Sequence, residues 1–232
     1  MIAARCSVDN LLPLVGSRPI DSALQTTLTA THIAAGSVCL ASGVLAASVK
    51  ALGLPHRAHV VAGRAFVWGM IGVCATAIAL ALIGERVLVL LLLVAVLSGY
   101  LAFAGWREAV RLRRPCAWLD RAAAFLMIAA AAIMLIWGGW ALLGGATGGI
   151  VLLLFGSIGG MVAVIDLHRL RHPAQRAART AHHMACMLGA TTAVVTAALV
   201  VNVRFEPAWA VWIAPTLLST PIIFLWSKRV GS

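Results

Sequence analysis

The histidines are the main candidates for chemistry in this 232-residue chain. Its seven acidic residues leave little for acid–base pairs. His59 and His183 each lie about one turn inside a different apolar run, at matched depth. Six-coordinate haem needs such a pair, since the iron takes one axial nitrogen from each face. A proton relay would use the same pair. The spacing therefore predicts axial ligands of haem b or a proton relay; the alternative is interfacial histidines without either role.

His32 and Arg64 are further candidates inside apolar runs. His32 lies eleven residues beyond Asp21, which is about 16 Å along a helix. Ionisable groups inside a membrane are costly and are functional candidates, so we expect His32 to serve an outer-side quinone or proton site. The alternative is a neutral imidazole bonded to a threonine or a backbone carbonyl. Arg64, five residues beyond His59, is expected to contact protons, a quinone or a haem propionate; the alternative is that it snorkels to lipid phosphates.

A metal site is the weaker interpretation of the remaining histidines. His172, His182 and His183 could combine with Asp166 or His168, but Pro173 and a run of arginines interrupt the spacing. Nearby positive charge disfavours a cation, so we expect no metal ion. The sequence contains no HExxH, GxSxG or P-loop motif, and it leaves open whether the protein is an enzyme.

The elements that position these residues follow from the low charge of the chain. Charged residues make up 11% and hydrophobic residues 62%, whereas soluble domains carry about 25% charged residues. A membrane-spanning helix needs about 20 apolar residues. The sequence therefore predicts an all-α transmembrane domain over residues 22–229 after a short extracytoplasmic tail, 1–21. Its seven expected spans are 24–49, 60–84, 87–107, 119–140, 149–167, 179–202 and 208–227.

Three details of these spans are expected to shape the bundle. Repeated glycines near 138–149 predict a turn between two helices, and Pro215 and Pro221 predict kinks in the last one. The pair Gly156 and Gly160 is expected to pack within one chain in preference to a dimer interface. The five cysteines form no CxxC pair, so we expect buried, inert thiols.

The orientation follows from the distribution of lysine and arginine. Loops after the first, third and fifth spans, with the carboxyl terminus, hold fourteen of the eighteen basic residues, and the other side holds Arg5, Arg18, Arg86 and Arg204. Basic loops stay in the cytoplasm. We therefore expect an outer amino terminus, an inner carboxyl terminus and location in the bacterial cytoplasmic membrane. We attribute the net charge of +11 to basic residues in the loops that set the membrane orientation. No nucleic-acid partner is expected.

Two stretches of the chain resemble a group of bacterial membrane proteins known as domain of unknown function 2306. The first runs from His32 to the element His59-Val60-Val61-Ala62-Gly63-Arg64. The second comprises His183-Met184-Ala185-Cys186-Met187 and the prolines of the last span; where the group often has an arginine, this chain has Cys186. The resemblance implies importance for His32, His59, Arg64 and His183, and it implies no activity.

Three functions remain open at this point. The first is a redox-type protein with haem b or a quinone, in which His59 and His183 ligate the iron. The second is a non-catalytic subunit or assembly factor of a larger membrane complex, because the loops leave little room for a soluble active site. The third is a proton-coupled transporter of a small solute, favoured by His32 and by the prolines of the last span.

Overall fold

The computed structural model describes residues 22–83, 89–110, 117–172 and 175–231, and the described residues form helices joined by turns, with no strand among them. The helices are α1 (Ser22–Ala51), α2 (His56–Ile83), α3 (Val89–Val110), α4 (Ala117–Leu143), α5 (Gly149–Arg171), α6 (Arg176–Asn202) and α7 (Ala208–Gly231). All seven are long and apolar enough to cross a membrane. The predicted all-α architecture with seven spans is confirmed. The predicted tail, 1–21, lies outside the described residues.

The helix boundaries extend the predicted spans toward the charged ends. α2 begins at His56 and α6 at Arg176, a few residues before the apolar runs start. A helix can continue past the hydrocarbon because its backbone bonds are satisfied internally. The predicted turn between α4 and α5 is present, and Gly145 has φ +80 there, a backbone conformation that favours glycine. α7 runs through both Pro215 and Pro221.

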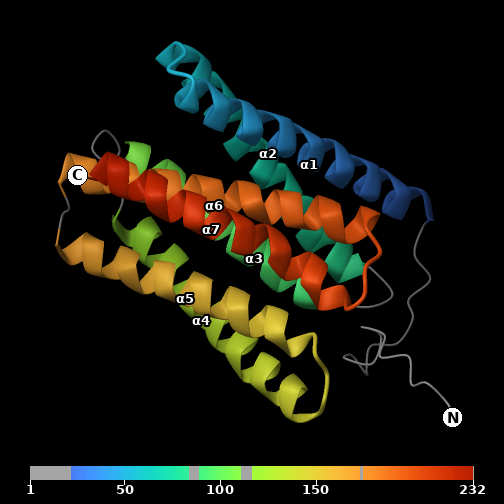
Figure 1. The fold of residues 1–232 in the computed structure, drawn as a ribbon. Helices are drawn as coiled ribbons and strands as arrows, with labels where there is room; N and C mark the ends of the chain where they lie inside the picture. The colour runs from blue at the N-terminus through green and yellow to red at the C-terminus, as the bar shows by residue number, and fades with distance from the viewer. Residues whose placement is uncertain (1–21, 84–88, 111–116, 173–174, 232) are drawn as a thin grey trace, which may run out of the picture.

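The bundle consists of two helix hairpins flanking a central group (Figure 1). α1 packs on α2, α4 packs on α5, and the central α3 contacts α6, which in turn packs on α7. Close approach depends on small residues: a Cβ at Gly156 would lie 2.9 Å from the Cβ of Met134 on α4. Gly156 therefore packs inside the chain, as predicted.

Apolar side chains cover the outside of the bundle as well as its interior. Phe66, Met127 and Met134 are fully buried, yet Trp68, Ile136 and Val201 are 72%, 75% and 81% exposed. In water such a surface would be unstable; in a bilayer it faces lipid tails. Cys39 and Cys186 are buried free thiols, as expected, and Cys74 is partly buried.

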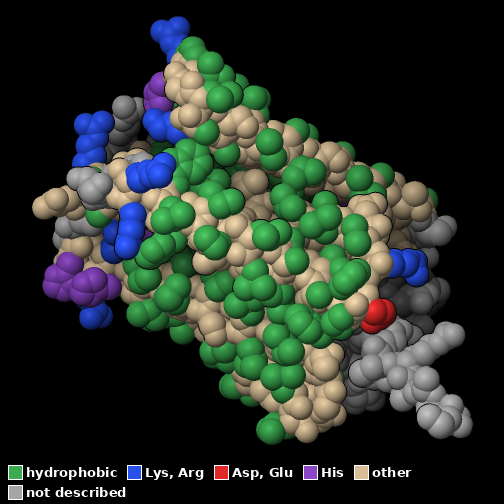
Figure 2. All heavy atoms as spheres, viewed as in Figure 1, with side chains coloured by type: hydrophobic (Ala, Val, Ile, Leu, Met, Phe, Trp, Pro, Cys, Tyr) green, Lys and Arg blue, Asp and Glu red, His purple; other side chains and the backbone are tan. Residues whose placement is uncertain are grey.

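Charge separates the two ends of the molecule (Figure 2). We call the end where α1, α3, α5 and α7 finish the basic end; its described lysines and arginines include Lys50, Arg107, Arg169, Arg179 and Lys228. The opposite end carries Arg204 and Glu206 in the short segment between α6 and α7. The candidate histidines His59 and His183 lie near the basic end because α2 and α6 begin there.

Candidate functional site

His59 and His183 meet near the basic end of the bundle. His59 lies in the first turn of α2, and His183 about two turns into α6. Their ring centroids are 6.3 Å apart, and the ring planes are inclined at 79°. His56 stacks beside His59 with a centroid separation of 6.2 Å. The structure thus brings together the two imidazoles that the sequence singled out.

Backbone carbonyls fix the hydrogens on both rings. His59 Nδ1 lies 3.1 Å from the carbonyl oxygen of Ala46 on α1, and His183 Nδ1 lies 2.7 Å from that of Gly105 on α3. A carbonyl can only accept, so each Nδ1 carries a hydrogen and donates it. In the neutral imidazole, each Nε2 then keeps its lone pair. Within the described part of the chain, neither Nε2 has a hydrogen-bond partner.

His32 lies in the other half of the bundle, away from this pair. Its Nδ1 is 2.8 Å from the hydroxyl oxygen of Thr76 on α2. The Thr76 hydroxyl donates to the carbonyl of Gly72 at 2.7 Å, so it accepts a hydrogen from His32. This is the threonine-bonded imidazole that the sequence allowed as the alternative to a quinone or proton site.

Arg64 points away from the histidine pair. Its side chain is exposed and makes no interaction with the described residues. Trp68, one turn along α2, is exposed on the same side of the helix. Both side chains point away from the rest of the bundle, which on a membrane-spanning helix is the direction expected for an arginine that snorkels. The structure does not bring Arg64 to His59 or His183.

Buried ion pairs at the ends of α3 to α6 were not predicted from the sequence. Arg107 and Asp120 form a bidentate pair in which Arg107 Nη2 donates to Asp120 Oδ2 at 3.1 Å, and both residues are buried. Glu108 accepts from Arg169 Nε at 3.4 Å and from Arg179 Nε at 3.1 Å. Arg179 also donates to the backbone carbonyl of Glu108 at 2.7 Å. These contacts join α3 to α4, α5 and α6.

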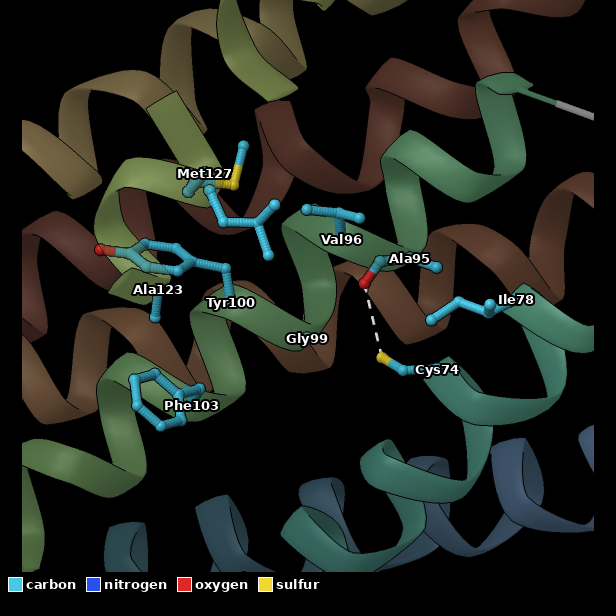
Figure 3. A pocket seen from close by; sticks show the side chains of 10 residues that line it. Cys74, Ile78, Ala95, Val96, Gly99, Tyr100, Phe103, Ala123 and Met127 are labelled. Atoms are coloured by element: carbon cyan, nitrogen blue, oxygen red, sulfur yellow. Dashed lines mark hydrogen bonds between the residues drawn. The ribbon is translucent and has the colours of Figure 1, made fainter. Parts of the chain in front are cut away.

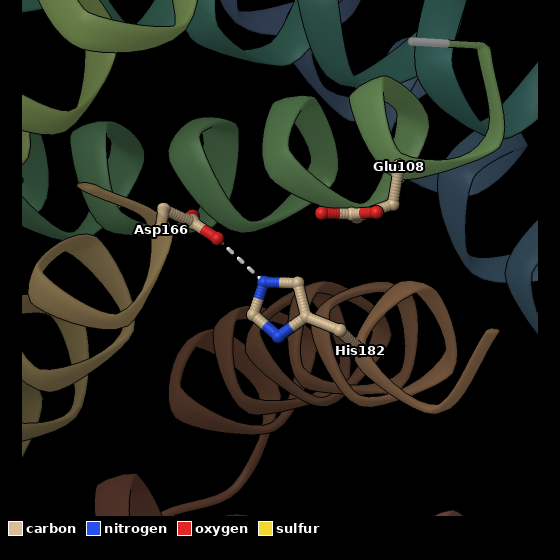
Figure 4. Close-up of side chains that lie close together, drawn as sticks. All are labelled: Glu108, Asp166 and His182. Atoms are coloured by element: carbon tan, nitrogen blue, oxygen red, sulfur yellow. Dashed lines mark hydrogen bonds and ion pairs between the residues drawn. The ribbon is translucent and has the colours of Figure 1, made fainter. Parts of the chain in front are cut away.

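Asp166 is the third buried carboxylate of this region, and it has different partners. The Tyr100 hydroxyl donates to Asp166 Oδ2 at 2.6 Å. His182 Nε2 lies 2.6 Å from Asp166 Oδ1 (Figure 4). Cys186 Sγ is 3.6 Å from the same His182 nitrogen. No lysine or arginine of the described residues forms an ion pair with Asp166. We call Tyr100, Asp166 and His182 the Asp166 triad.

Only some of the residues predicted as possible metal ligands lie together in the structure. His182 meets Asp166, but His168 and His172 contact each other with ring centroids 4.6 Å apart. The ligand atoms of Glu108, Asp166 and His182 lie within 4.8 Å of one another. Glu108, however, already forms ion pairs with Arg169 and Arg179, and the charge of these arginines repels a cation. The charges of the two arginines therefore disfavour a metal ion at these three residues.

Two cavities adjoin the Asp166 triad. The larger, about 260 Å³, lies between α2, α3 and α4; its apolar walls include Cys74, Tyr100, Phe103 and Met127 (Figure 3). The smaller, about 10 Å³, is lined by Tyr100, Phe103, Ala104, Arg107, Asp120 and Asp166. Tyr100 therefore separates an apolar cavity from a polar one.

Comparison with protein-family models, curated proteins and solved structures finds no match to this chain. The resemblance to domain of unknown function 2306 stays a prediction from the quoted motifs. The functional argument therefore depends on the geometry of the histidine pair and of the Asp166 triad.

Proposed function

We propose that the protein is a redox-type membrane protein in which His59 and His183 are the axial ligands of a b-type haem. The observation that carries the proposal is the pair of Nε2 lone pairs on two neighbouring rings in a T-shaped arrangement, each ring fixed by an Nδ1–carbonyl hydrogen bond. Metal-binding histidines commonly donate their other ring hydrogen to a carbonyl, which fixes the tautomer and the ring orientation. This arrangement is present on both rings.

The spacing of the rings supports the same assignment. A metal–imidazole bond is about 2 Å long, so two imidazoles on one metal have ring centres about 6 Å apart. The observed separation is 6.3 Å. α2 packs mainly on α1 and α3, and α6 on α3 and α7.

The bound haem would supply one-electron chemistry at the membrane. The protein's own part in this proposal is limited to ligation and orientation by His59 and His183. Arg64 faces the lipid, and His32 is bonded to Thr76, so neither belongs to the ligand set. A quinone at His32 is accordingly not part of the proposal.

The location of the site follows from the topology that we propose for the chain. Basic residues concentrate at the end where the carboxyl terminus lies, and such ends stay in the cytoplasm. The haem would then lie in the inner leaflet of a bacterial cytoplasmic membrane. A reporter active only in the cytoplasm, fused after Ser232, should be active; activity of a periplasmic reporter at that site would reverse the topology.

A visible spectrum of the purified protein tests the proposed ligands. Protein from cells supplied with a haem precursor should show a Soret band, with the spectrum of a six-coordinate haem. His59→Ala and His183→Ala should each abolish that spectrum, because each removes one axial nitrogen. His32→Ala is the matched control, since His32 is also a membrane histidine, and it should leave the spectrum unchanged. Protein without haem, or with unchanged spectra in both ligand variants, would refute the proposal.

A further inference from the structure

We propose that the outward face of the first part of α2 binds the phosphate headgroup of an anionic membrane lipid, with Arg57 and Arg64 as the basic side chains of the site. The site uses neither His59 nor His183, so it does not depend on the proposed haem. The proposal comes from the positions of the two arginines on the helix, from the lack of an available carboxylate among the described residues, and from the apolar side chains beside them.

Arg57, Val61, Arg64 and Trp68 form one exposed stripe along α2. Residues follow one another by about 100° around a helix, so these four positions lie within about 60° of one another. Val61 and Trp68 are 68% and 72% exposed, and both arginines are exposed as well. Other sides of α2 pack on α1 and α3 (Figure 1). The stripe therefore points away from the bundle, and in a membrane it meets the lipid.

The order of side chains along the stripe matches the order of groups in a lipid molecule. α2 begins at the basic end, and Arg57 lies in its first turn. Arg64 follows about 10 Å further along the axis, and Trp68 about 6 Å beyond Arg64. An arginine stem can extend along apolar surface while its guanidinium reaches the headgroups. The two guanidinium groups can therefore meet a phosphate at the membrane surface, while Trp68 faces the acyl chains.

Arg64 needs a counterion from outside the described chain. Arginine stays charged at any accessible pH, and a charge within a membrane span is costly unless it is paired. Arg107, which also lies in a membrane-spanning helix, is buried and pairs with Asp120. Neither Arg57 nor Arg64 has such a contact among the described residues. The partner of Arg64 must then come from the surroundings of the bundle.

The described carboxylates are not available for this role. Glu108, Asp120 and Asp166 are buried and have partners on neighbouring helices. Glu206, the fourth acidic residue of the described chain, lies between α6 and α7 at the opposite end. A second copy of the described residues thus brings no available carboxylate to the basic end, whereas an anionic lipid brings a phosphate. Charge complementarity therefore favours the lipid.

The chemistry of guanidinium and phosphate fits this assignment. Arginine offers a planar fork of N–H donors that binds phosphate oxygens in pairs. Basic residues near the membrane surface attract anionic lipids, and each contributes about a fivefold preference. Lys50, in the last turn of α1, is exposed as well and adds positive charge at this end of the bundle. The site should therefore favour phosphatidylglycerol over phosphatidylcholine, which has no net charge.

Trp68 can report which lipid lies beside the arginines. The full-length protein is placed in two bilayers, each with equal parts of phosphatidylglycerol and phosphatidylcholine. In one bilayer only phosphatidylglycerol carries brominated acyl chains, and in the other only phosphatidylcholine does. Bromine quenches the fluorescence of a tryptophan that it contacts, and the difference between wild type and Trp68→Phe isolates the Trp68 signal. Brominated phosphatidylglycerol should quench Trp68 more strongly than brominated phosphatidylcholine.

Removing the arginines should remove this preference. Arg57→Gln and Arg64→Gln should each lower the ratio of phosphatidylglycerol to phosphatidylcholine at Trp68 about fivefold, and the double variant should be quenched equally in both bilayers. Trp140 is the matched control, because it is also 72% exposed and lies near the end of α4 that is remote from the basic end. Its signal, isolated with Trp140→Phe, should not respond to either arginine substitution. Inorganic phosphate, compared with chloride at equal ionic strength, should leave the Trp68 quenching unchanged.

Four results would overturn the inference. Equal quenching of Trp68 in the two bilayers would mean that the wild type does not select the anionic headgroup. An undiminished preference in the double variant would mean that other residues cause it. Displacement of the brominated lipid by inorganic phosphate would identify a site for free phosphate. A Trp68 signal that neither bilayer quenches would mean that a second copy of the chain covers this face of α2.

Discussion

Glu108 and Asp166 are two buried carboxylates at the same end of one bundle, and they have different kinds of partner. Glu108 lies between Arg169 and Arg179, whose guanidinium groups stay charged at any accessible pH. Asp166 lies between the phenol of Tyr100 and the imidazole of His182, and both of its carboxylate oxygens have a hydrogen-bond partner. The first carboxylate is held by two arginines, whereas the second is held by hydrogen bonds from side chains that are not guanidinium groups.

The comparison shows that one cluster holds its buried carboxylates in two ways, by arginine pairs and by hydrogen bonds from Tyr100 and His182. Arginine pairs connect α3 to α4, α5 and α6 with fixed charges. Within this frame, Asp166 joins α5 to α3 through Tyr100 and to α6 through His182. A buried charge without a partner would be costly, and each of the three buried carboxylates has partners on a neighbouring helix.

Removing Glu108 should give the largest loss of stability. Glu108→Ala leaves Arg169 and Arg179 partly buried without their carboxylate, and breaking a buried pair in this way costs about 3–5 kcal/mol. The measurement is reversible unfolding of the purified protein in mixed micelles with increasing SDS. Asp166→Asn is the comparison variant; we expect it to cost less, because the amide oxygen can still accept from Tyr100 and no arginine loses its partner. An equal or larger loss for Asp166→Asn would contradict the distinction between the two carboxylates.

A smaller loss should follow from removing the Tyr100 hydroxyl. Tyr100→Phe deletes the 2.6 Å hydrogen bond to Asp166 Oδ2 and leaves a buried acceptor unsatisfied, at a cost of about 1–3 kcal/mol. The same unfolding measurement checks this value. Phe103→Leu, a neighbouring change on the wall of the larger cavity, controls for altered packing. A loss below that of the control would mean that Tyr100 does not hold Asp166 in place.

The helices were predictable from the sequence, and their neighbours in space were not. Crossing the hydrocarbon requires about 20 apolar residues, so charge-free runs located all seven helices. His59 and His183 were expected to meet because both follow loops on the same side of the membrane. Glu108 was not singled out in the sequence, and Asp166 was considered only as a possible metal ligand beside the histidines. Hydropathy does not tell which helices pack together, and the ion pairs depend on α3 packing against α6.

Side-chain direction on α2 explains why Arg64 does not lie beside His59. Residues follow one another by about 100° around a helix, so five positions place Arg64 about 140° away from His59. The structure has His59 directed at Ala46 and His183, while Arg64 is exposed. The separation of five residues in the sequence already implied that the side chains of His59 and Arg64 point in different directions. The remaining sequence signal for the buried ion pairs was that opposite charges lie at the ends of different apolar runs.

Arg64 should give the smallest effect and the sharpest contrast with the buried arginines. Its side chain interacts with none of the described residues, and surface substitutions away from specific contacts change stability by less than about 0.5 kcal/mol. Arg64→Ala should therefore unfold at nearly the SDS concentration of wild type, whereas Arg179→Ala should unfold much earlier because it removes a partner of Glu108. Arg64→Ala should also leave the proposed Soret spectrum unchanged. A large loss of stability, or a shifted spectrum, would mean that Arg64 turns inward to a partner, and the lipid-facing assignment of this side of α2 would have to be abandoned.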